Sequence, residues 1–162
     1  MISTRETGKS WLFQEYWAFD TVPSAHDQEQ YARALMICAA GDGAISRPER
    51  DWVKGYFAAF GCSDELLDLL ETYEGDEPLE SVLERSEAVA VSARALVHDA
   101  IRACAADDDL NAGELAMIRA MNRRLGQDDE LVDRWLDYHQ DDKLLRKRRA
   151  EIIWPDVQRK PY

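Results

Sequence analysis

The sequence predicts an all-α fold, a single-domain helical bundle with two pseudo-symmetric halves. The chain has 162 residues, of which 46% are hydrophobic, and these are the size and composition of one globular domain. It contains 8 glycines and 5 prolines, so residues that break helices are few. No segment of useful length alternates apolar and polar residues as a half-buried strand would. These observations favour helices throughout.

An internal repeat divides the chain into the two halves. When the sequence is shifted by 65 residues, residues 34–70 align with residues 99–135. The identical pairs include Ala40 with Ala105, Asp42 with Asp107, Glu49 with Glu114, Gly61 with Gly126, and Asp64 with Asp129. Apolar positions also keep the same phase, and chance rarely matches identities and hydrophobic phase together. We therefore expect the halves to superpose by an approximate two-fold rotation.

Each half is predicted to contain a helix, a tight loop, a second helix, a glycine stop and a third helix. Ser24 begins the first helix, and Gly41 and Gly43 end it. Its counterpart is expected from about Glu87 to Ala106. The second helices carry apolar stripes, made of Trp52, Val53, Tyr56, Phe57 and Phe60 in one half and Met117, Ile118, Met121 and Leu125 in the other. We interpret the stripes as core faces, each buried against the opposite half, with a cofactor pocket as the alternative.

The segments outside the repeat complete the expected organisation. Short helices are predicted over residues 10–20 and 76–85, and a last helix over residues 141–153 ends before Pro155. We divide the chain into three parts, an aromatic-rich N-terminal segment (1–24), a helical domain (25–140) and a basic helix with its tail (141–162).

Charge is distributed unevenly along the chain. The net charge of −12 combines −17 on the first 142 residues with +5 on the remainder, where seven basic residues outnumber two acidic ones. Because an acidic body repels nucleic acid, we expect a protein partner, basic or membrane-associated, rather than nucleic acid. We expect the basic tail to pack loosely on this body through its apolar residues, with an anionic membrane or nucleic acid as the alternative partner. These apolar residues are Leu144, Leu145, Ile152 and Ile153.

Neither export nor membrane insertion is indicated. No stretch approaches the roughly 18 apolar residues of a membrane span, and charged residues are mixed with the aromatic residues of the N-terminal segment. Cys38, Cys62 and Cys104 are odd in number and widely spaced, so we interpret them as reduced thiols. We expect a cytoplasmic location and no transmembrane segment.

The loop after the first helix resembles the second half of an EF-hand calcium loop. Asp42 falls on position 5, Gly43 on the sharp-turn position 6, and Glu49 on the bidentate position 12. Positions 1 and 3 are Cys38 and Ala40, which offer calcium no hard oxygen ligand. A complete EF-hand site is therefore excluded.

The second copy of the loop keeps part of this pattern. Asp107 and Glu114 take the two acidic positions, Asp108 replaces the turn glycine, and Asp109 adds one more carboxylate. We predict a hard divalent cation at one or both loops, calcium first, with magnesium or manganese as alternatives. The candidate ligands are Asp42, the backbone oxygen of Ala44, Glu49, Asp107, Asp109 and Glu114. So few ligands imply a dissociation constant on the order of 10⁻⁵ to 10⁻³ M.

Helix capping is the competing explanation for the two glutamates. Ser46-x-x-Glu49 has capping-box spacing, and Asn111 with Glu114 repeats it. Capping explains the loop aspartates less well, because a carboxylate near a helix C-terminus is disfavoured by the helix dipole. A turn-forming aspartate or a bound cation would offset this cost, and both alternatives stay open.

The segment Asp42-Gly43-x-Ile45-Ser46-x-x-Glu49, its degenerate second copy and the acidic all-α chain resemble the TerB-like domain of tellurite resistance proteins. The resemblance covers about residues 25–140. It implies a bundle of about seven or eight helices with two pseudo-symmetric halves, acidic loops that bind divalent metal, and a role in bacterial stress responses, in some members beside membrane-linked partners. Because Asp108 replaces the turn glycine, the resemblance does not imply one ion in each half.

Three function classes follow from these observations. The first is a metal-binding interaction module, and the second is an interaction module that needs no ion. The third is a small enzyme that uses Asp107 and Glu114 as paired carboxylates. The enzyme ranks last, because the sequence holds no His-Glu-x-x-His motif, phosphate-binding loop or nucleophile elbow.

Overall fold

The computed structural model describes residues 3–108 and 110–162, and these residues form helices and loops without a β-strand. The α-helices are α1 (Thr4–Trp17), α2 (Ala25–Ala39), α3 (Arg47–Ala59), α4 (Asp64–Thr72), α5 (Leu79–Arg85), α6 (Glu87–Val91), α7 (Ala93–Cys104), α8 (Ala112–Arg124) and α9 (Asp129–Ile153). Short 3₁₀ helices are η1 (Ala40–Asp42), η2 (Ala105–Asp107) and η3 (Val157–Arg159). The predicted all-α class is confirmed.

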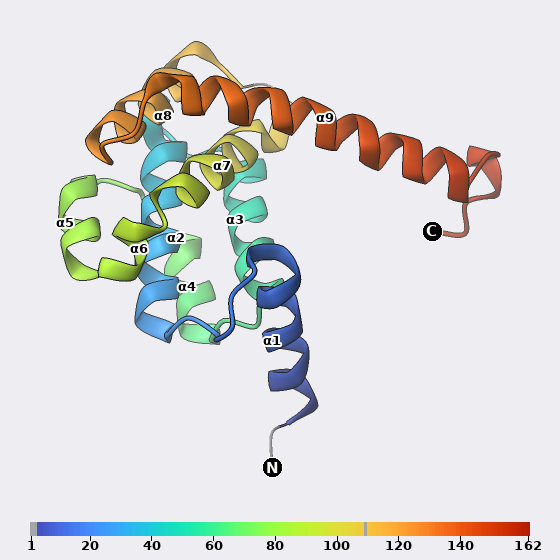
Figure 1. The fold of residues 1–162 in the computed structure, drawn as a ribbon, viewed down its shortest axis with the longest axis horizontal. Helices are drawn as coiled ribbons and strands as arrows, with labels where there is room; N and C mark the ends of the chain where they lie inside the picture. The colour runs from blue at the N-terminus through green and yellow to red at the C-terminus, as the bar shows by residue number, and fades with distance from the viewer. Residues whose placement is uncertain (1–2, 109) are drawn as a thin grey trace.

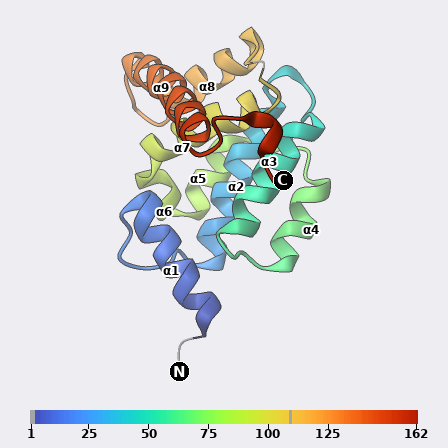
Figure 2. The same ribbon diagram turned by 90° about the vertical axis from the view of Figure 1, so that its right-hand side faces the viewer.

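The core lies where α2 packs along α7. Both helices are rich in small and branched apolar residues, which allow the two backbones to approach closely. Buried members include Ala34, Leu35, Met36 and Ala39 of α2, and Leu96, Val97, Ala100 and Ile101 of α7. The remaining helices surround this pair, with α1 at one end of the bundle and α9 at the other (Figures 1 and 2).

The internal repeat is confirmed in the element boundaries. In the second half, α7, η2 and α8 take the places of α2, η1 and α3. η1 and α3 end 65 residues before η2 and α8 end, and α4 begins 65 residues before α9 begins. The turn residues correspond as well, because Gly43 and Asp108 both adopt left-handed backbone angles, with φ of 107° and 68°. Gly61 and Gly126 end α3 and α8 in the same left-handed conformation.

The second helix of each half packs against the other half. α8 packs on η1 of the first half, and α3 packs on η2 of the second half. At Gly41 the approach is so close that an added Cβ would lie 2.7 Å from the Cβ of Met117. Val53, Phe57, Ile118 and Met121 are buried, which confirms that these stripe residues are core residues.

Two helix boundaries differ from those predicted. The helix expected from Glu87 to Ala106 is divided at Ser92 into α6 and α7. Both helices pack on α2, but α6 also packs on α5 whereas α7 also packs on α9. The separate helix expected over residues 141–153 is the second part of α9, since no glycine or proline lies between Asp129 and Ile153. The described residues therefore form nine α-helices rather than seven or eight.

The expectation that the apolar residues of the basic tail pack on the acidic body is wrong. Leu144, Leu145, Ile152 and Ile153 are between 55% and 73% exposed. The first part of α9 packs on α7 and α8, and Lys143 and Arg146 still reach the second loop and the pocket beside it. The residues after Arg146 add about 10 Å of helix that extends beyond the body (Figure 1). Among the described residues, no helix has both the length and the apolar character that crossing a bilayer requires.

Replacement of Gly41 by alanine tests the close approach of the two halves. The new methyl group would overlap Met117, so we expect the free energy of unfolding to fall by about 1 to 3 kcal/mol. Gly55→Ala is the matched control, because a Cβ at this exposed position of α3 meets no atom within 4 Å. We expect it to raise stability by about 0.5 to 1 kcal/mol. Urea unfolding of both variants measures the effects, and equal stability of Gly41→Ala and wild type would contradict the packing.

Candidate functional site

The first candidate loop connects η1 to α3. Ser46 caps α3, with its hydroxyl oxygen accepting the amide of Glu49 at 3.3 Å. The Glu49 side chain reaches back, and its Oε2 accepts the amide of Ser46 at 2.6 Å. This is the capping box that the spacing predicted. The loop is therefore held at both ends, by the left-handed Gly43 and by the Glu49 carboxylate.

The cap uses one oxygen of Glu49 and leaves the other without a partner. Glu49 is 2% exposed, and its Oε1 is buried with no hydrogen-bond donor in the described structure. A buried carboxylate oxygen that lacks a partner costs free energy that a bound cation or an ordered water would recover. Capping explains the position of the Glu49 side chain. It does not explain why the second carboxylate oxygen is buried without a partner among the described residues.

Cys38, at position 1 of the EF-hand alignment, belongs to the core. Cys38 is 1% exposed, and its Sγ lies 3.0 Å from Sδ of Met121. Burial raises the pKa of the Cys38 thiol to about 12, so the thiol keeps its proton at neutral pH. The exclusion of Cys38 as a cation ligand agrees with these contacts.

The second candidate loop has the same cap and a different electrostatic setting. Glu114 is 3% exposed, and its Oε2 accepts the amide of Asn111 at 2.9 Å. Asp107 is exposed, and Asp108 binds Nζ of Lys143 at 2.8 Å. This ion pair lowers the pKa of the Asp108 carboxyl group. The second loop is thus tied to α9 through an ammonium group.

Basic side chains surround a pocket of about 340 Å³ beside this second loop. Arg102, His139, Lys143 and Arg146 line it together with Asp108. Two of these cations have acidic partners of their own, since Arg102 pairs with Asp99 and Arg146 with Asp142. The density of positive charge nevertheless opposes the entry of a metal cation from this side.

The structure describes the candidate ligands only in part. The Glu49 and Glu114 side chains lie buried at corresponding positions, while Ala44 and Asp107 are exposed. The Asp42 side chain and Asp109 lie outside what the structure describes. Within the described part of the chain, no three His, Cys, Asp or Glu side chains are close enough to share a metal ion. The predicted ligand sets therefore stay predictions.

A buried cluster around Asp99 was missed by the sequence analysis. Asp99 is fully buried, and its carboxylate accepts hydrogen bonds from the Tyr31 hydroxyl and the Arg102 guanidinium, both at 3.2 Å. The Arg102 guanidinium in turn lies 5.0 Å from the ring centroid of Trp52. Burial and the Asp99 charge both raise the pKa of Tyr31. The cluster joins α2, α3 and α7, and the signal for it was one acidic residue inside the apolar run Leu96–Ile101.

The fold and its two turns define an all-α module of duplicated helix–turn–helix halves with acidic turns. Its structure is similar to the crystal structure of a tellurite resistance protein from Nostoc punctiforme, with a TM-score of 0.93 and 34% sequence identity over 100% of both chains. No protein-family model and no curated protein matches the sequence. The chain belongs to the TerB-like family of tellurite resistance proteins, which confirms the resemblance found in its sequence.

Replacement of His139 tests the electrostatics of the pocket beside the second loop. Burial lowers the pKa of His139, and Lys143, Arg146 and His98 lower it further, against a smaller opposite effect of Asp142. The unfolded chain therefore binds a proton near pH 6.5 that the folded chain resists, and stability falls as the pH drops below this value. We expect His139→Gln to lose less stability between pH 7.5 and pH 5 than wild type does. Parallel stability curves in urea unfolding would contradict this assignment.

Proposed function

We propose that this chain is a stress-response module that binds a hard divalent cation at its first loop and acts through a protein partner. The family supports the stress-response part, because the similar structure is that of a tellurite resistance protein. The cation is supported by one observation, the buried Oε1 of Glu49, which has no hydrogen-bond donor among the described residues. The capping box accounts for Oε2 of Glu49. A bound ligand would explain why the other oxygen, Oε1, is buried without a partner among the described residues.

The chemistry of the loop favours a cation that prefers oxygen ligands. Glu49 would supply Oε1, and the sequence register adds the Asp42 carboxylate and the backbone oxygen of Ala44. Calcium accepts six to eight such oxygens in flexible geometry, so waters or a second protein would complete its shell. When bound, the ion would neutralise the carboxylates and hold the loop against the start of α3. Magnesium and manganese are alternatives with the same ligand preference.

The charges around the second loop make it a poorer cation site than the first loop. Lys143 binds Asp108 at the turn of the second loop, and Arg102 and Arg146 line the adjacent pocket. A cation at the second loop would be repelled by these groups and would compete with Lys143. The pair Asp107 and Glu114 is also weakly suited to acid–base catalysis, because one Glu114 oxygen accepts the Asn111 amide.

A cation site with so few ligands is weak, and this weakness is the reason for including a partner. A dissociation constant on the order of 10⁻⁵ to 10⁻³ M leaves the site largely empty at micromolar calcium. A partner that donates further oxygen ligands would raise the affinity. The exposed basic part of α9 and the acidic body offer such a partner two surfaces of opposite charge. We therefore expect the ion to act at an interface.

Thermal unfolding of chelator-treated protein with added calcium, magnesium or manganese tests the cation site. At about 10 mM calcium and a dissociation constant of about 1 mM, binding stabilises the folded state by about 1.4 kcal/mol. We expect the melting temperature of the wild type to rise by about 3 °C. Glu49→Gln should abolish this rise, because glutamine keeps the cap but loses the charge.

Two control variants separate the cation from general charge effects. Glu114→Gln makes the same change in the second loop and should keep most of the calcium response. Asp68→Asn changes an exposed residue of α4 and should keep all of it. A wild type that shows neither heat of binding nor a thermal shift with any of the three ions would rule out the site. The loops would then be caps and turns without an ion.

A further inference from the structure

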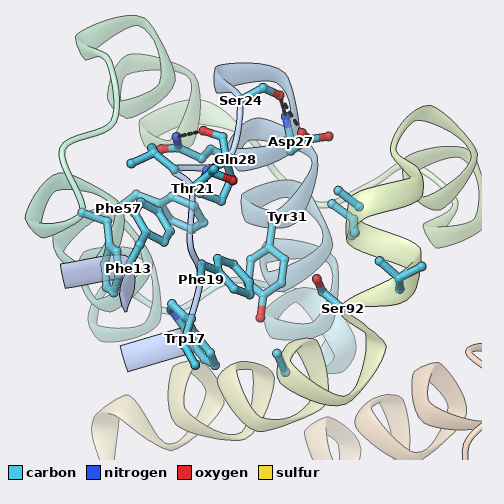
Figure 3. Close-up of a pocket in the computed structure, with 18 of the residues that line it drawn as sticks. Phe13, Trp17, Phe19, Thr21, Ser24, Asp27, Gln28, Tyr31, Phe57 and Ser92 are labelled. Atoms are coloured by element: carbon cyan, nitrogen blue, oxygen red, sulfur yellow. Dashed lines mark hydrogen bonds between the residues drawn. The ribbon is translucent and has the colours of Figure 1, made fainter. Parts of the chain in front are cut away.

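A second cavity lies at the other end of the bundle from the basic pocket. It has a volume of about 600 Å³, is partly open to solvent, and is lined by α1, residues 18–24, α2, α3 and the junction of α6 with α7. Figure 3 shows the rings of Phe13, Trp17, Phe19, Tyr31 and Phe57 gathered around it. This volume is within the range of small-molecule sites, and its lining is mainly apolar. None of the described residues of the two candidate loops lines it.

The walls of the cavity are fixed by aromatic packing. The ring of Phe13 packs edge-on against Phe60 with centroids 4.7 Å apart, and it stacks on Phe19 at 6.2 Å. Lys9 ties α1 to the end of α3 by donating to the carbonyl oxygen of Gly61 at 3.0 Å. Since α1 is attached at several points, the space beneath it is a preformed cavity.

Gln28 gives the apolar lining an unused hydrogen-bond acceptor. Its side chain is 5% exposed, and its amide nitrogen donates to the carbonyl oxygen of Pro23 at 2.8 Å. This bond fixes the orientation of the amide, which leaves Oε1 buried and without a donor in the described structure. A ligand with an N–H or O–H group would supply the missing bond. Tyr31 cannot do so, because its hydroxyl donates to Asp99.

The charge around the cavity selects among such ligands. Asp20 and Asp27 are the charged residues in its lining, and both are acidic. The Ser24 hydroxyl, followed by that of Ser86, lowers the pKa of Asp27, so this carboxylate stays ionised at neutral pH. No Lys, Arg or His side chain among the described residues lines the cavity. An anionic ligand would therefore enter without a counter-charge.

We propose that this cavity binds a small apolar molecule, neutral or cationic, whose N–H or O–H group donates to Oε1 of Gln28. The aromatic walls would hold the apolar body of the ligand, and the acidic rim would exclude fatty acids and other carboxylates of the same size. The site goes beyond the cation-dependent function proposed above and does not depend on it. It is made by different elements, apart from α3, and its ligand needs no metal.

Four naphthalene probes that share one apolar body test the site. 1-Naphthylmethylamine is cationic, 1-naphthalenemethanol is a neutral donor, 1-methylnaphthalene lacks a donor, and 1-naphthoate is anionic. We expect the amine and the alcohol to bind about 3- to 10-fold more tightly than methylnaphthalene, which is the range of one hydrogen bond. Naphthoate should bind most weakly. Amide chemical shifts in NMR titrations measure the affinities and should change first at residues 18–28 and around Ser92.

Variants show which side chain gives the site its preference for probes that donate a hydrogen bond. Gln28→Leu should keep binding of methylnaphthalene and remove the advantage of the alcohol, whereas the exposed Gln14→Leu on α1 should change neither. Ala95→Phe should weaken all probes by filling the cavity. The proposal is overturned if naphthoate binds as tightly as the alcohol, if the shifts map elsewhere, or if Gln28→Leu keeps the preference. If Gln28→Leu does not fold, the ranking of probes on the wild type still decides.

Discussion

The close approach of the two halves at Gly41 is the constraint on which the rest of the structure depends. Only a residue without a side chain allows Met117 of α8 to lie on η1, and the corresponding contact brings α3 onto η2. Each half thus completes the core of the other. Both acidic turns are thereby held against the opposite half, with their glutamates in capping boxes at the start of α3 and α8.

Most polar groups in this packed interior have partners, which makes the exceptions informative. The Asp99 carboxylate has Tyr31 and Arg102, and the buried Arg50 donates to the carbonyl oxygens of Leu70 and Tyr73. Six buried side-chain atoms have no partner among the described residues: Oε1 of Glu49, Oε1 of Gln28, Oδ1 of Asn122, Nε1 of Trp135, and Nδ1 of both His98 and His139. Two of these atoms, Oε1 of Glu49 and Oε1 of Gln28, belong to the proposed sites. These two atoms lie at different sites, one beside an acidic turn and one in an aromatic cavity. Different ligand chemistry would satisfy each, a cation in the first case and an N–H or O–H donor in the second.

The sequence predicted the parts of the fold that depend on local signals. Capping residues such as Ser46 and Asn111, and the left-handed Gly61 and Gly126, mark boundaries that the repeat then duplicates. The division at Ser92 was not predictable in this way, because it accompanies tertiary contacts, those of α6 with α5 and of α7 with α9. The course of α9 was mispredicted for a related reason. Its basic residues suggested attraction to the acidic body, and Lys143 does bind Asp108. The stiffness of an uninterrupted helix carries the residues after Arg146 away from the body.

The candidate site was predictable only in part. The spacing of Asp42 and Glu49 located the first loop, but no pattern in the sequence shows that one Glu49 oxygen is buried without a donor. Lys143 is 35 residues from Asp108, so their contact follows from the tertiary fold. The cavity beside Gln28 was anticipated only as the alternative interpretation of the α3 stripe, since its walls also need aromatic residues of α1 that are distant in sequence. Its one sequence signal was the aromatic stripe of α3, which serves both as core and as cavity wall.

The most direct test of this account is anomalous diffraction from crystals of the wild-type chain soaked in manganese. The account predicts a manganese peak bonded to Oε1 of Glu49 in the first loop, and its loss in crystals of Glu49→Gln. A well-ordered Glu49 with no anomalous peak beside it, at a manganese concentration in the millimolar range, would contradict the account. The buried oxygen would then be satisfied by water or left unpaired, and the loop would serve only to join η1 to α3.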